Sequence, residues 1–193
     1  EYHQQSLTIA KEIGDRNDEG NALGNLGNAY DSLGDYTQAI NYHQQSLTIL
    51  REIGDRKGEG STLGNLGNAY YAIGNYPQAI YYYQKDLAIA QEIGARNGEG
   101  STLGNLGLAY YELGNYAQAI DYHQQSLTIA REIGDRNGEG TALGNLGRVY
   151  NSLGNYLQAI EYCQQHLTIA REIGDRNGEG IALGNLGNAY DSL

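Results

Sequence analysis

The stretch LGNLGNAY, at residues 23 to 30, decides the fold because it recurs along the chain. It returns unchanged at 63 and 183, as LGNLGLAY at 103 and as LGNLGRVY at 143. Two other stretches keep the same spacing, since EIGDR starts at 12, 52, 132 and 172, and QAI at 38, 78, 118 and 158. Self-similarity at a fixed period of 40 residues indicates stacked units, each needing its neighbours to cover its apolar face.

Each period contains two helical patterns. Apolar residues recur at helical spacing from Ala22 to Leu33, and Gly34 suits the left-handed residue that follows a helix end. This pattern predicts a first helix, helix A, from about Arg16 to Leu33. Asp35 and Gln38 then form a capping-box-like start for a second one.

The second helix, helix B, is predicted to run to about Ile53 and to stop at Gly54. Pro77 falls in the first turn of a later B helix, where its missing N–H costs little. We therefore expect no kink there.

The predicted fold is all-α: a single-domain, right-handed superhelical α-solenoid of antiparallel helix pairs with about ten helices. It has four full repeats and a half repeat at each end. The predicted boundaries are 1–15 for a partial helix B, then 16–55, 56–95, 96–135 and 136–175, and 176–193 for a final helix A.

The segment NLGNAYDSLGDYTQAINYHQQSL, at 25–47, resembles the tetratricopeptide repeat (TPR) family. Two departures matter: the family's helix-ending Pro is absent, and the period is 40 rather than 34. The longer pattern is similar to the repeat arrays of the LGN/Pins spindle-orientation adaptors and of large cyanobacterial proteins. The family's signature columns are occupied by Leu26, Gly27, Tyr30, Ala39 and Ser46, with Leu23 in place of its usual Trp.

The resemblance implies a non-catalytic scaffold that binds a peptide or partner protein in a concave groove. Members that bind acidic carboxyl-terminal peptides use Lys or Arg in the columns of Gly24 and Asn28. Only Arg148 matches that pattern. We therefore expect no carboxylate clamp, and a neutral or basic ligand rather than an acidic one.

The glycines of helix A raise a separate question, because a mid-helix Gly costs up to about 1 kcal/mol relative to Ala. Rotation at 100° per residue places Gly27 at the edge of the packed arc, where a missing Cβ permits close helix approach. It places Gly20 and Gly24 on the open arc, where Gly24 would make room for a ligand. The alternative is that all three glycines only allow tight packing between repeats.

Asparagines share this open arc. An Asn amide offers both a donor and an acceptor, so a column of them can bind the backbone of a peptide whatever its side chains. The alternative is that Asn merely suits a solvated face or bonds within the array. The two columns are Asn25, Asn65, Asn105, Asn145 and Asn185, and Asn28, Asn68 and Asn188, the second interrupted by Leu108 and Arg148.

Variation between repeats concentrates on the same arc. Tyr71, Leu108 and Tyr111 would give the central groove an apolar, aromatic patch of the kind found at interface hot spots, with Arg148 beside it as a basic group. The alternative is that these surface positions vary by drift because nothing constrains them. These four residues complete the predicted peptide-binding set.

Composition narrows the possible functions. A formal net charge of −11 argues against nucleic acid as a partner, and no apolar run reaches the roughly 18 residues of a membrane span. We expect a soluble, cytoplasmic protein, since the lone Cys163 cannot form an internal disulfide.

The sequence suggests no active site. Its closely spaced glycines match neither a dinucleotide fingerprint nor a phosphate loop. Cys163 and His166 could supply two metal ligands, too few for a structural zinc site. His3, His43 and His123 share a helix B column and are expected to be semi-buried packing residues. We predict no enzyme activity, cofactor or metal.

A second functional hypothesis is structural. The chain begins in a B helix and ends in an A helix, so one molecule could complete a helix pair with the next. Such a head-to-tail contact would build open filaments.

Overall fold

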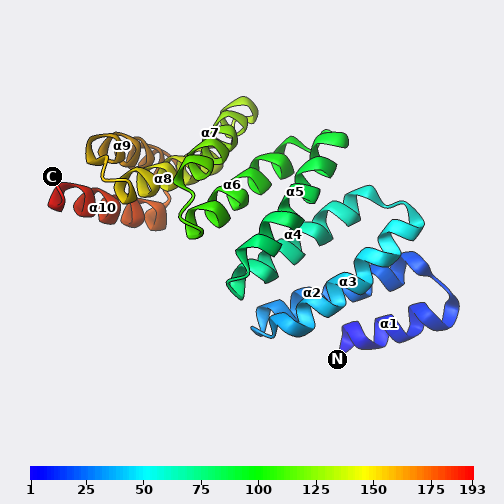
Figure 1. Cartoon of the computed structure of the whole chain (residues 1–193). Helices are drawn as coiled ribbons and strands as arrows, with labels where there is room; N and C mark the ends of the chain where they lie inside the picture. The colour runs from blue at the N-terminus through cyan, green and yellow to red at the C-terminus, as the bar shows by residue number, and fades with distance from the viewer. The chain divides into compact units, whose positions relative to one another are not determined.

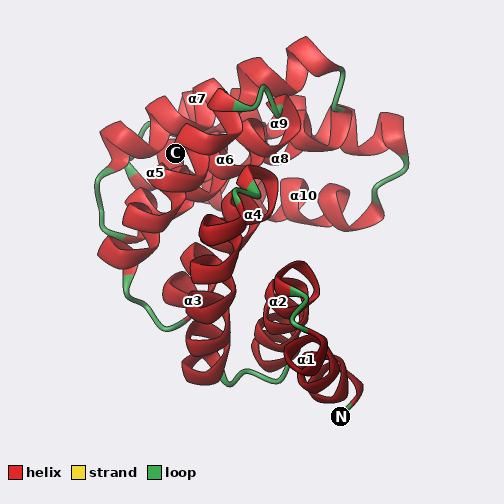
Figure 2. Ribbon diagram, turned by 90° about the vertical axis from the view of Figure 1, so that its right-hand side faces the viewer, coloured by secondary structure: helices red, strands yellow, loops and turns green.

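The computed structural model describes all 193 residues and confirms the all-α repeat fold (Figure 1). It contains ten α-helices joined by short loops and no strand (Figure 2). The helices are α1 Tyr2–Ile13, α2 Arg16–Ser32, α3 Tyr36–Ile53, α4 Arg56–Ala72, α5 Tyr76–Glu92, α6 Arg96–Glu112, α7 Tyr116–Ile133, α8 Arg136–Ser152, α9 Tyr156–Ile173 and α10 Arg176–Asp191.

The chain divides into two compact units, Glu1–Ala95 (unit 1) and Arg96–Leu193 (unit 2). In unit 1, α2 pairs with α3 and α4 with α5, while α1 packs on α2 and α3 on α4. In unit 2, α6 pairs with α7 and α8 with α9, while α7 packs on α8 and α9 on α10. Each unit is thus a stack of helix pairs. The predicted organisation of residues 1–193 as one domain stays a prediction.

The predicted helix ends are confirmed to within about one residue. The Asp35 carboxylate accepts a hydrogen bond from the backbone N–H of Gln38 at 3.1 Å, as expected for an N-cap. Gly54 ends α3 with φ of 74°, in the left-handed region. Pro77 lies in the first turn of α5. Local sequence signals therefore place the helices.

The core consists of the same columns in successive repeats. Leu23, Leu63 and Leu143 are at most 1% exposed, as is Leu146. In unit 1 one cluster joins Leu7 and Ile49 to the apolar face of α2. Equivalent clusters form around α4 and α8. The A helices α2, α4 and α8 are therefore each buried by the B helices on either side, as expected for units that cannot fold alone.

A pair of stacked tyrosine rings joins the two helices of each A–B pair. The rings of Tyr30 and Tyr42 stack with centroids 5.3 Å apart, and those of Tyr70 and Tyr82 do the same. In unit 2, Tyr110 stacks on Tyr122 and Tyr150 on Tyr162 in the same way. Much of the aromatic content is therefore structural.

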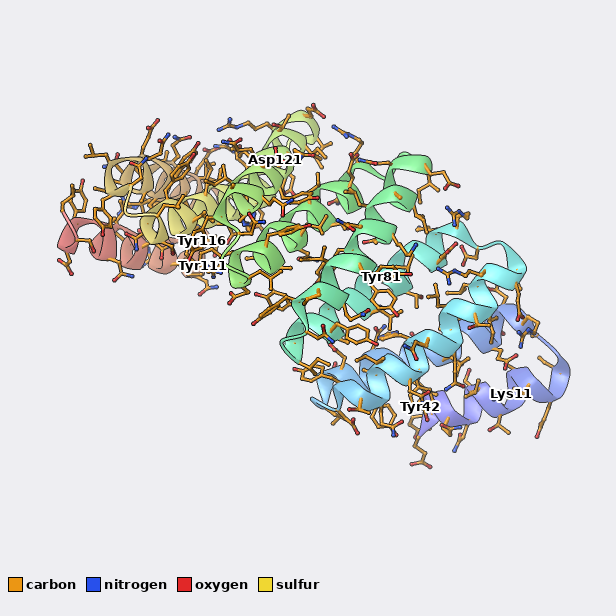
Figure 3. The ribbon with its side chains drawn as sticks, viewed as in Figure 1. Lys11, Tyr42, Tyr81, Tyr111, Tyr116 and Asp121 are labelled. Atoms are coloured by element: carbon orange, nitrogen blue, oxygen red, sulfur yellow. The ribbon has the colours of Figure 1, made fainter.

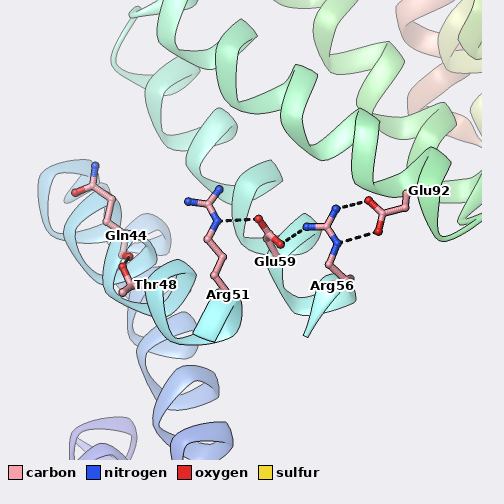
Figure 4. A network of polar contacts seen from close by, with 6 residues as sticks. All are labelled: Gln44, Thr48, Arg51, Arg56, Glu59 and Glu92. Carbon is pink, nitrogen blue, oxygen red and sulfur yellow. Dashed lines mark hydrogen bonds and ion pairs between the residues drawn. The ribbon is translucent and has the colours of Figure 1, made fainter. Parts of the chain in front are cut away.

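Charged side chains link successive B and A helices. In unit 1 the buried Glu59 carboxylate accepts hydrogen bonds from Arg51 at 2.8 Å and from Arg56 (Figure 4). Arg56 also donates to Glu92 on α5, its Nε lying 3.0 Å from Oε1. Arg136 in unit 2 repeats this arrangement with Glu139 and Glu172. The EIGDR motif thus supplies a recurrent ion-pair network.

The open position predicted for Gly20 is only partly right, because Gly20 borders a hollow between α2, α3 and α4 but is also buried. Gly20 is buried against α3, and a Cβ there would lie 3.2 Å from Cγ2 of Ile49. Its carbonyl also accepts a hydrogen bond from the Ser46 hydroxyl at 2.8 Å. The simple rotation missed this contact because α3 covers the first turns of α2 more widely than a single apolar arc implies.

None of the ten helices has both the length and the apolar character needed to span a membrane.

Candidate peptide-binding face

Unit 1 contains a polar pocket of about 310 Å3 between α2, α3 and α4. Gly24 and Asn25 contribute from α2, Ser46 and Leu50 from α3, and Asn65 from α4. Asp55, which caps α4 by accepting from the Gly58 N–H, also lies at its edge. The open arc of the A helices is therefore hollowed where consecutive repeats meet.

Unit 2 contains a pocket of about 300 Å3 at the equivalent place, between α6, α7 and α8. Its residues Gly104, Asn105, Ser126 and Asn145 correspond to those of the unit 1 pocket at a shift of 80. The two pockets are thus the same structural feature, formed independently in each unit. In each unit, we call the surface that carries its Asn columns and its pocket the A-helix face of that unit.

Gly24 does two things at once. It lines the unit 1 pocket, and a Cβ there would come within 3.4 Å of the Ser46 hydroxyl. Gly104 is similar, with Ser126 at 3.6 Å. Both glycines line their pockets, and a Cβ at either would make ordinary van der Waals contact with helix B. A role of this column in making room for a ligand stays a prediction.

The predicted Asn columns lie on the A-helix face, exposed or half-buried. In unit 1 the Asn65 amide donates to Oδ1 of Asn28 at 3.0 Å. This bond joins neighbouring A helices, so part of the ladder bonds within the array. Asn25, Asn28 and Asn65 all line the unit 1 pocket, and Asn105 and Asn145 line the unit 2 pocket.

The remaining predicted asparagines lie outside these pockets. Asn68 accepts a hydrogen bond from the Tyr83 hydroxyl at 2.7 Å. Asn185 is half-buried and Asn188 exposed, both on α10. The second Asn column is therefore less uniform in its contacts than its sequence suggests.

The predicted aromatic and basic residues are engaged within their own units. In unit 2 the Arg148 guanidinium lies 4.0 Å from the ring centroid of Tyr111 and 3.3 Å from a Glu112 carboxylate oxygen. The Tyr111 hydroxyl lies 2.9 Å from that of Ser152, and its ring contacts Tyr116, beside it in Figure 3. Arg148 is thus a preorganised part of the surface, with part of its charge already neutralised.

Tyr71 lies in unit 1, with its ring edge-on to Tyr76 at a centroid distance of 5.4 Å. Leu108 is half-buried on α6 and lines the unit 2 pocket. A single patch formed by Tyr71, Leu108 and Tyr111 stays a prediction.

The helix B column of His43, Tyr83, His123 and Cys163 is more deeply buried than predicted. His43 and His123 are each 1% exposed, whereas His3 on α1 is exposed. The reason is the glycine column of helix A: a Cβ on Gly27 would lie 2.4 Å from the His43 ring. This confirms the packing role predicted for Gly27.

Sequence reasoning missed the pocket residues that helix B contributes, among them Ser126 and His123 in unit 2. The prediction used helix A alone. The signal available in the sequence was the variation of the Ser46 column, in which His166 stands one repeat after Ser126. The His166 imidazole lies against Gly144, and a Cβ added to Gly144 would be 2.7 Å from its Nδ1. His166 thereby occupies the equivalent space between α8 and α9.

The titratable side chains form no group of three or more His, Cys, Asp or Glu residues that could hold a metal ion. Cys163 is buried, and burial raises the pKa of its thiol to about 11. A thiol of this kind is mostly protonated at neutral pH and therefore a weak nucleophile.

Comparisons with known proteins agree with this architecture. The G-protein-signaling modulator 1 proteins of mouse, rat and human are each 46% identical to the chain over 39 residues, which is 20% of the chain and 6% of those proteins. The chain therefore spans only a small part of the curated relatives that it matches.

The solved structures that resemble the fold include two with a sensor or ligand in their descriptions. A STAND ATPase with a tetratricopeptide repeat sensor from Pyrococcus horikoshii has a TM-score of 0.87 and 25% identity, covering 95% of this chain and 29% of that one. A Rap protein in complex with competence and sporulation factor has a TM-score of 0.79 and 17% identity, covering 94% of this chain and 54% of that one. The second likeness shows the fold alone.

The family model described as "Tetratricopeptide repeat" matches residues 1–52, 58–132 and 138–193. Together with the stacked helix pairs, the glycine-to-helix-B packing and the repeated pockets, this match shows that the chain belongs to the tetratricopeptide repeat family.

Proposed function

We propose that the chain is a non-catalytic interaction scaffold that binds an extended peptide, or an exposed segment of a partner protein, on the A-helix face within a unit. Tetratricopeptide repeat proteins are generally scaffolds of this kind. The observation that carries the proposal is the recurrence of one polar pocket at an 80-residue shift, with the same Gly, Asn and Ser columns in both units. Formation of the same pocket in each unit supports a common binding role for these columns.

An Asn ladder is best suited to binding the backbone of a peptide ligand. Asn105 and Asn145 contribute amides from neighbouring A helices to the unit 2 pocket, and each amide can pair with a backbone N–H or C=O. In unit 1, Asn25 would do the same, while Asn65 would exchange its bond to Asn28 for one to the ligand.

A neutral or basic ligand fits the charge of the chain. The net charge is −11, and Arg148, the cation on the predicted surface, is already paired with Glu112. An acidic peptide would have to displace that pair in unit 2, and Lys57 is the one cation among the residues that line the unit 1 pocket. Tyr71 in unit 1 and Leu108 and Tyr111 in unit 2 would each supply local apolar contact.

The structural relatives support ligand binding by this fold. The Rap protein was solved in complex with competence and sporulation factor, and the Pyrococcus repeats are a sensor. Neither identifies a ligand for this chain.

The test starts from peptides selected on the intact chain from a random display library. Calorimetric titration of a selected peptide then compares the chain with an Asn105→Ala/Asn145→Ala double variant. Loss of two hydrogen bonds of about 1 kcal/mol each should weaken binding roughly 30-fold. The control is Asn41→Ala, an exposed residue on α3 outside both pockets.

Asn41→Ala should bind as tightly as the parent chain, and circular dichroism should show that all variants stay helical. Equal affinity of the double variant and the parent would refute the Asn ladder, and failure to select any peptide would refute the peptide-binding function.

A second candidate function is head-to-tail self-association, favoured by two uncovered apolar faces. On α10, Leu183 is 48% and Tyr190 55% exposed, whereas the equivalent Leu143 is fully buried. On α1, Tyr2 is 82% and Ile9 56% exposed. A second copy could cover α10 with its α1, giving an open, heterologous contact.

A further inference from the structure

The helix α10 carries the packing surface of an A helix, but no B helix covers it. A Cβ added to Gly180, Gly184 or Gly187 would meet nothing within 4 Å. In α2, α4, α6 and α8, a Cβ at the glycines of the same columns would touch the B helix that follows. Leu183 and Tyr190 are about half exposed on the same helix. This face is therefore open to a second helix.

The helix α1 carries the matching surface of a B helix. One of its sides packs on α2, with Leu7 buried in the cluster that the two helices share. The side chains of Tyr2, His3, Ser6 and Ile9 are all exposed. Tyr2, Ser6 and Ile9 also border a hollow of about 290 Å3. The uncovered side of α1 can therefore receive another helix.

Three contacts recur at fixed sequence separations in all four A–B pairs of the chain. Two tyrosine rings stack, a helix A glycine faces a helix B side chain that its Cβ would overlap, and an arginine pairs with a glutamate. In α2 and α3 these pairs are Tyr30 with Tyr42, Gly27 with His43 and Arg16 with Glu52. Together they fix which residues of the two helices lie opposite each other.

The uncovered faces hold one half of each of these contacts. Residues 2–13 occupy the repeat columns of 42–53, and residues 176–191 those of 16–31. The A-helix halves on α10 are Tyr190, Gly187 and Arg176, and the B-helix halves on α1 are Tyr2, His3 and Glu12. Glu12 makes no ion pair, and Arg176 pairs only with Glu179 of its own helix. The two faces are therefore complementary in shape and in charge.

We propose that α1 of a second copy of this chain covers α10 in the register of a B helix on its A helix. The contacts are Tyr2 on Tyr190, the His3 imidazole on Gly187, and Glu12 with Arg176. The inference rests on the second candidate function, head-to-tail self-association, and names the residues that select the partner helix. Gly187 selects most strongly, because only a residue without a Cβ lets the His3 ring approach the helix.

Gly187→Ala separates this contact from the stability of the chain. In a single copy the added Cβ meets nothing, whereas at the equivalent Gly27 it would lie 2.4 Å from the His43 ring. Sedimentation velocity should therefore show association weakened about tenfold or more. Denaturant titration at a concentration where the parent is monomeric should show no loss of stability. Asn177→Ala, at a column that is exposed in every A helix, is the control and should associate like the parent.

Exchanging the two charges tests the register itself. Arg176→Glu and Glu12→Arg should each weaken association about three- to tenfold, because like charges would then face each other. An equimolar mixture of the two variants should associate as the parent does, since every contact between unlike copies again joins opposite charges. Circular dichroism should show that both variants stay helical. Recovery in the mixture is not expected of a contact that leaves these residues apart.

The register and the self-association on which it rests fail in different ways. A parent chain that stays monomeric at every concentration would overturn both. A parent chain that associates, while Gly187→Ala associates equally well or the mixed charge variants do not recover, would overturn the register alone. Weaker association of Gly187→Ala together with recovery in the mixture would establish the register.

Discussion

Gly107 shows how a residue that weakens a helix can stabilise a fold. A Cβ added to Gly107 would lie 2.5 Å from the nearest atom of the His123 ring, and one added to Gly67 would lie 2.4 Å from the Tyr83 ring. Real atoms do not approach so closely, so only glycine lets the ring lie flat on the helix. The helix-propensity cost of about 1 kcal/mol is offset by close packing between helices.

The packing role predicts that a Gly→Ala substitution changes the free energy of unfolding in opposite directions at two positions of the Gly27 column. Gly107→Ala should destabilise the chain by about 1–2 kcal/mol, because overpacking costs about 1–3 kcal/mol and exceeds the gain in helix propensity. Gly187→Ala on α10 should stabilise it by up to about 1 kcal/mol, because a Cβ there meets nothing within 4 Å. Denaturant titration of both variants gives the two free energies of unfolding. A shift of the same sign in both would contradict the packing role.

At the scale of the helix pair, the recurrent Arg–Glu network joins elements that the apolar core already holds together. Glu139 is 7% exposed and accepts from Arg131 at 2.8 Å and from Arg136. Glu172, which pairs with Arg136 across the helix pair, keeps 54% of its side chain exposed. The two carboxylates should therefore differ in their contribution to stability.

Glu139→Gln should destabilise the chain at pH 7 by about 1.5–3 kcal/mol, the range for buried hydrogen bonds to a charged group. Glu172→Gln, the exposed control, should cost about 0–1 kcal/mol. Denaturant titration measures both. A cost for Glu172→Gln equal to that for Glu139→Gln would contradict the role of burial.

The same network predicts the pH dependence. Burial raises the pKa of Glu139, but the hydrogen bonds and charges of Arg131 and Arg136 outweigh it, so the folded-state pKa lies below the ordinary 4.5. A lowered carboxyl pKa stabilises the fold above pH 4.5 and loses that contribution as the pH falls through the folded value. The stability difference between the parent and Glu139→Gln should therefore shrink below about pH 4.5. A difference that stays constant down to pH 3 would refute this.

At the scale of the whole molecule, the repeat made the fold predictable, while the details of the site depended on side chains from a second helix. Periodicity and caps such as Asp35 and Gly54 predicted ten helices, because these signals are local. The position of Gly20 could not be predicted in the same way, because the crossing of α3 over α2 decides which residues it covers. His123 was missed as a pocket residue for the same reason, since the pocket forms only when three helices meet.

The uncovered faces of α1 and α10 lead to a prediction about association. Residues 2–13 repeat the sequence of 122–133, with Lys11 in place of Arg131, so α1 carries the side chains that α7 packs against α6. A second copy of α1 could therefore cover Leu183 on α10 much as a B helix covers an A helix within a unit. A contact between one helix of each copy buries a small area, and we therefore expect weak, reversible association.

Sedimentation velocity over a concentration series should show an average mass that rises without reaching a closed dimer, because a heterologous contact adds copies at both ends. Leu183→Asp should abolish the rise, because it places a charge in the apolar contact. Leu157→Asp, at a position that is 73% exposed on α9, is the control and should leave the rise unchanged. A chain that stays monomeric at every concentration would exclude self-association. An equal loss in both variants would mean that the added charge, and not the α10 face, prevents it.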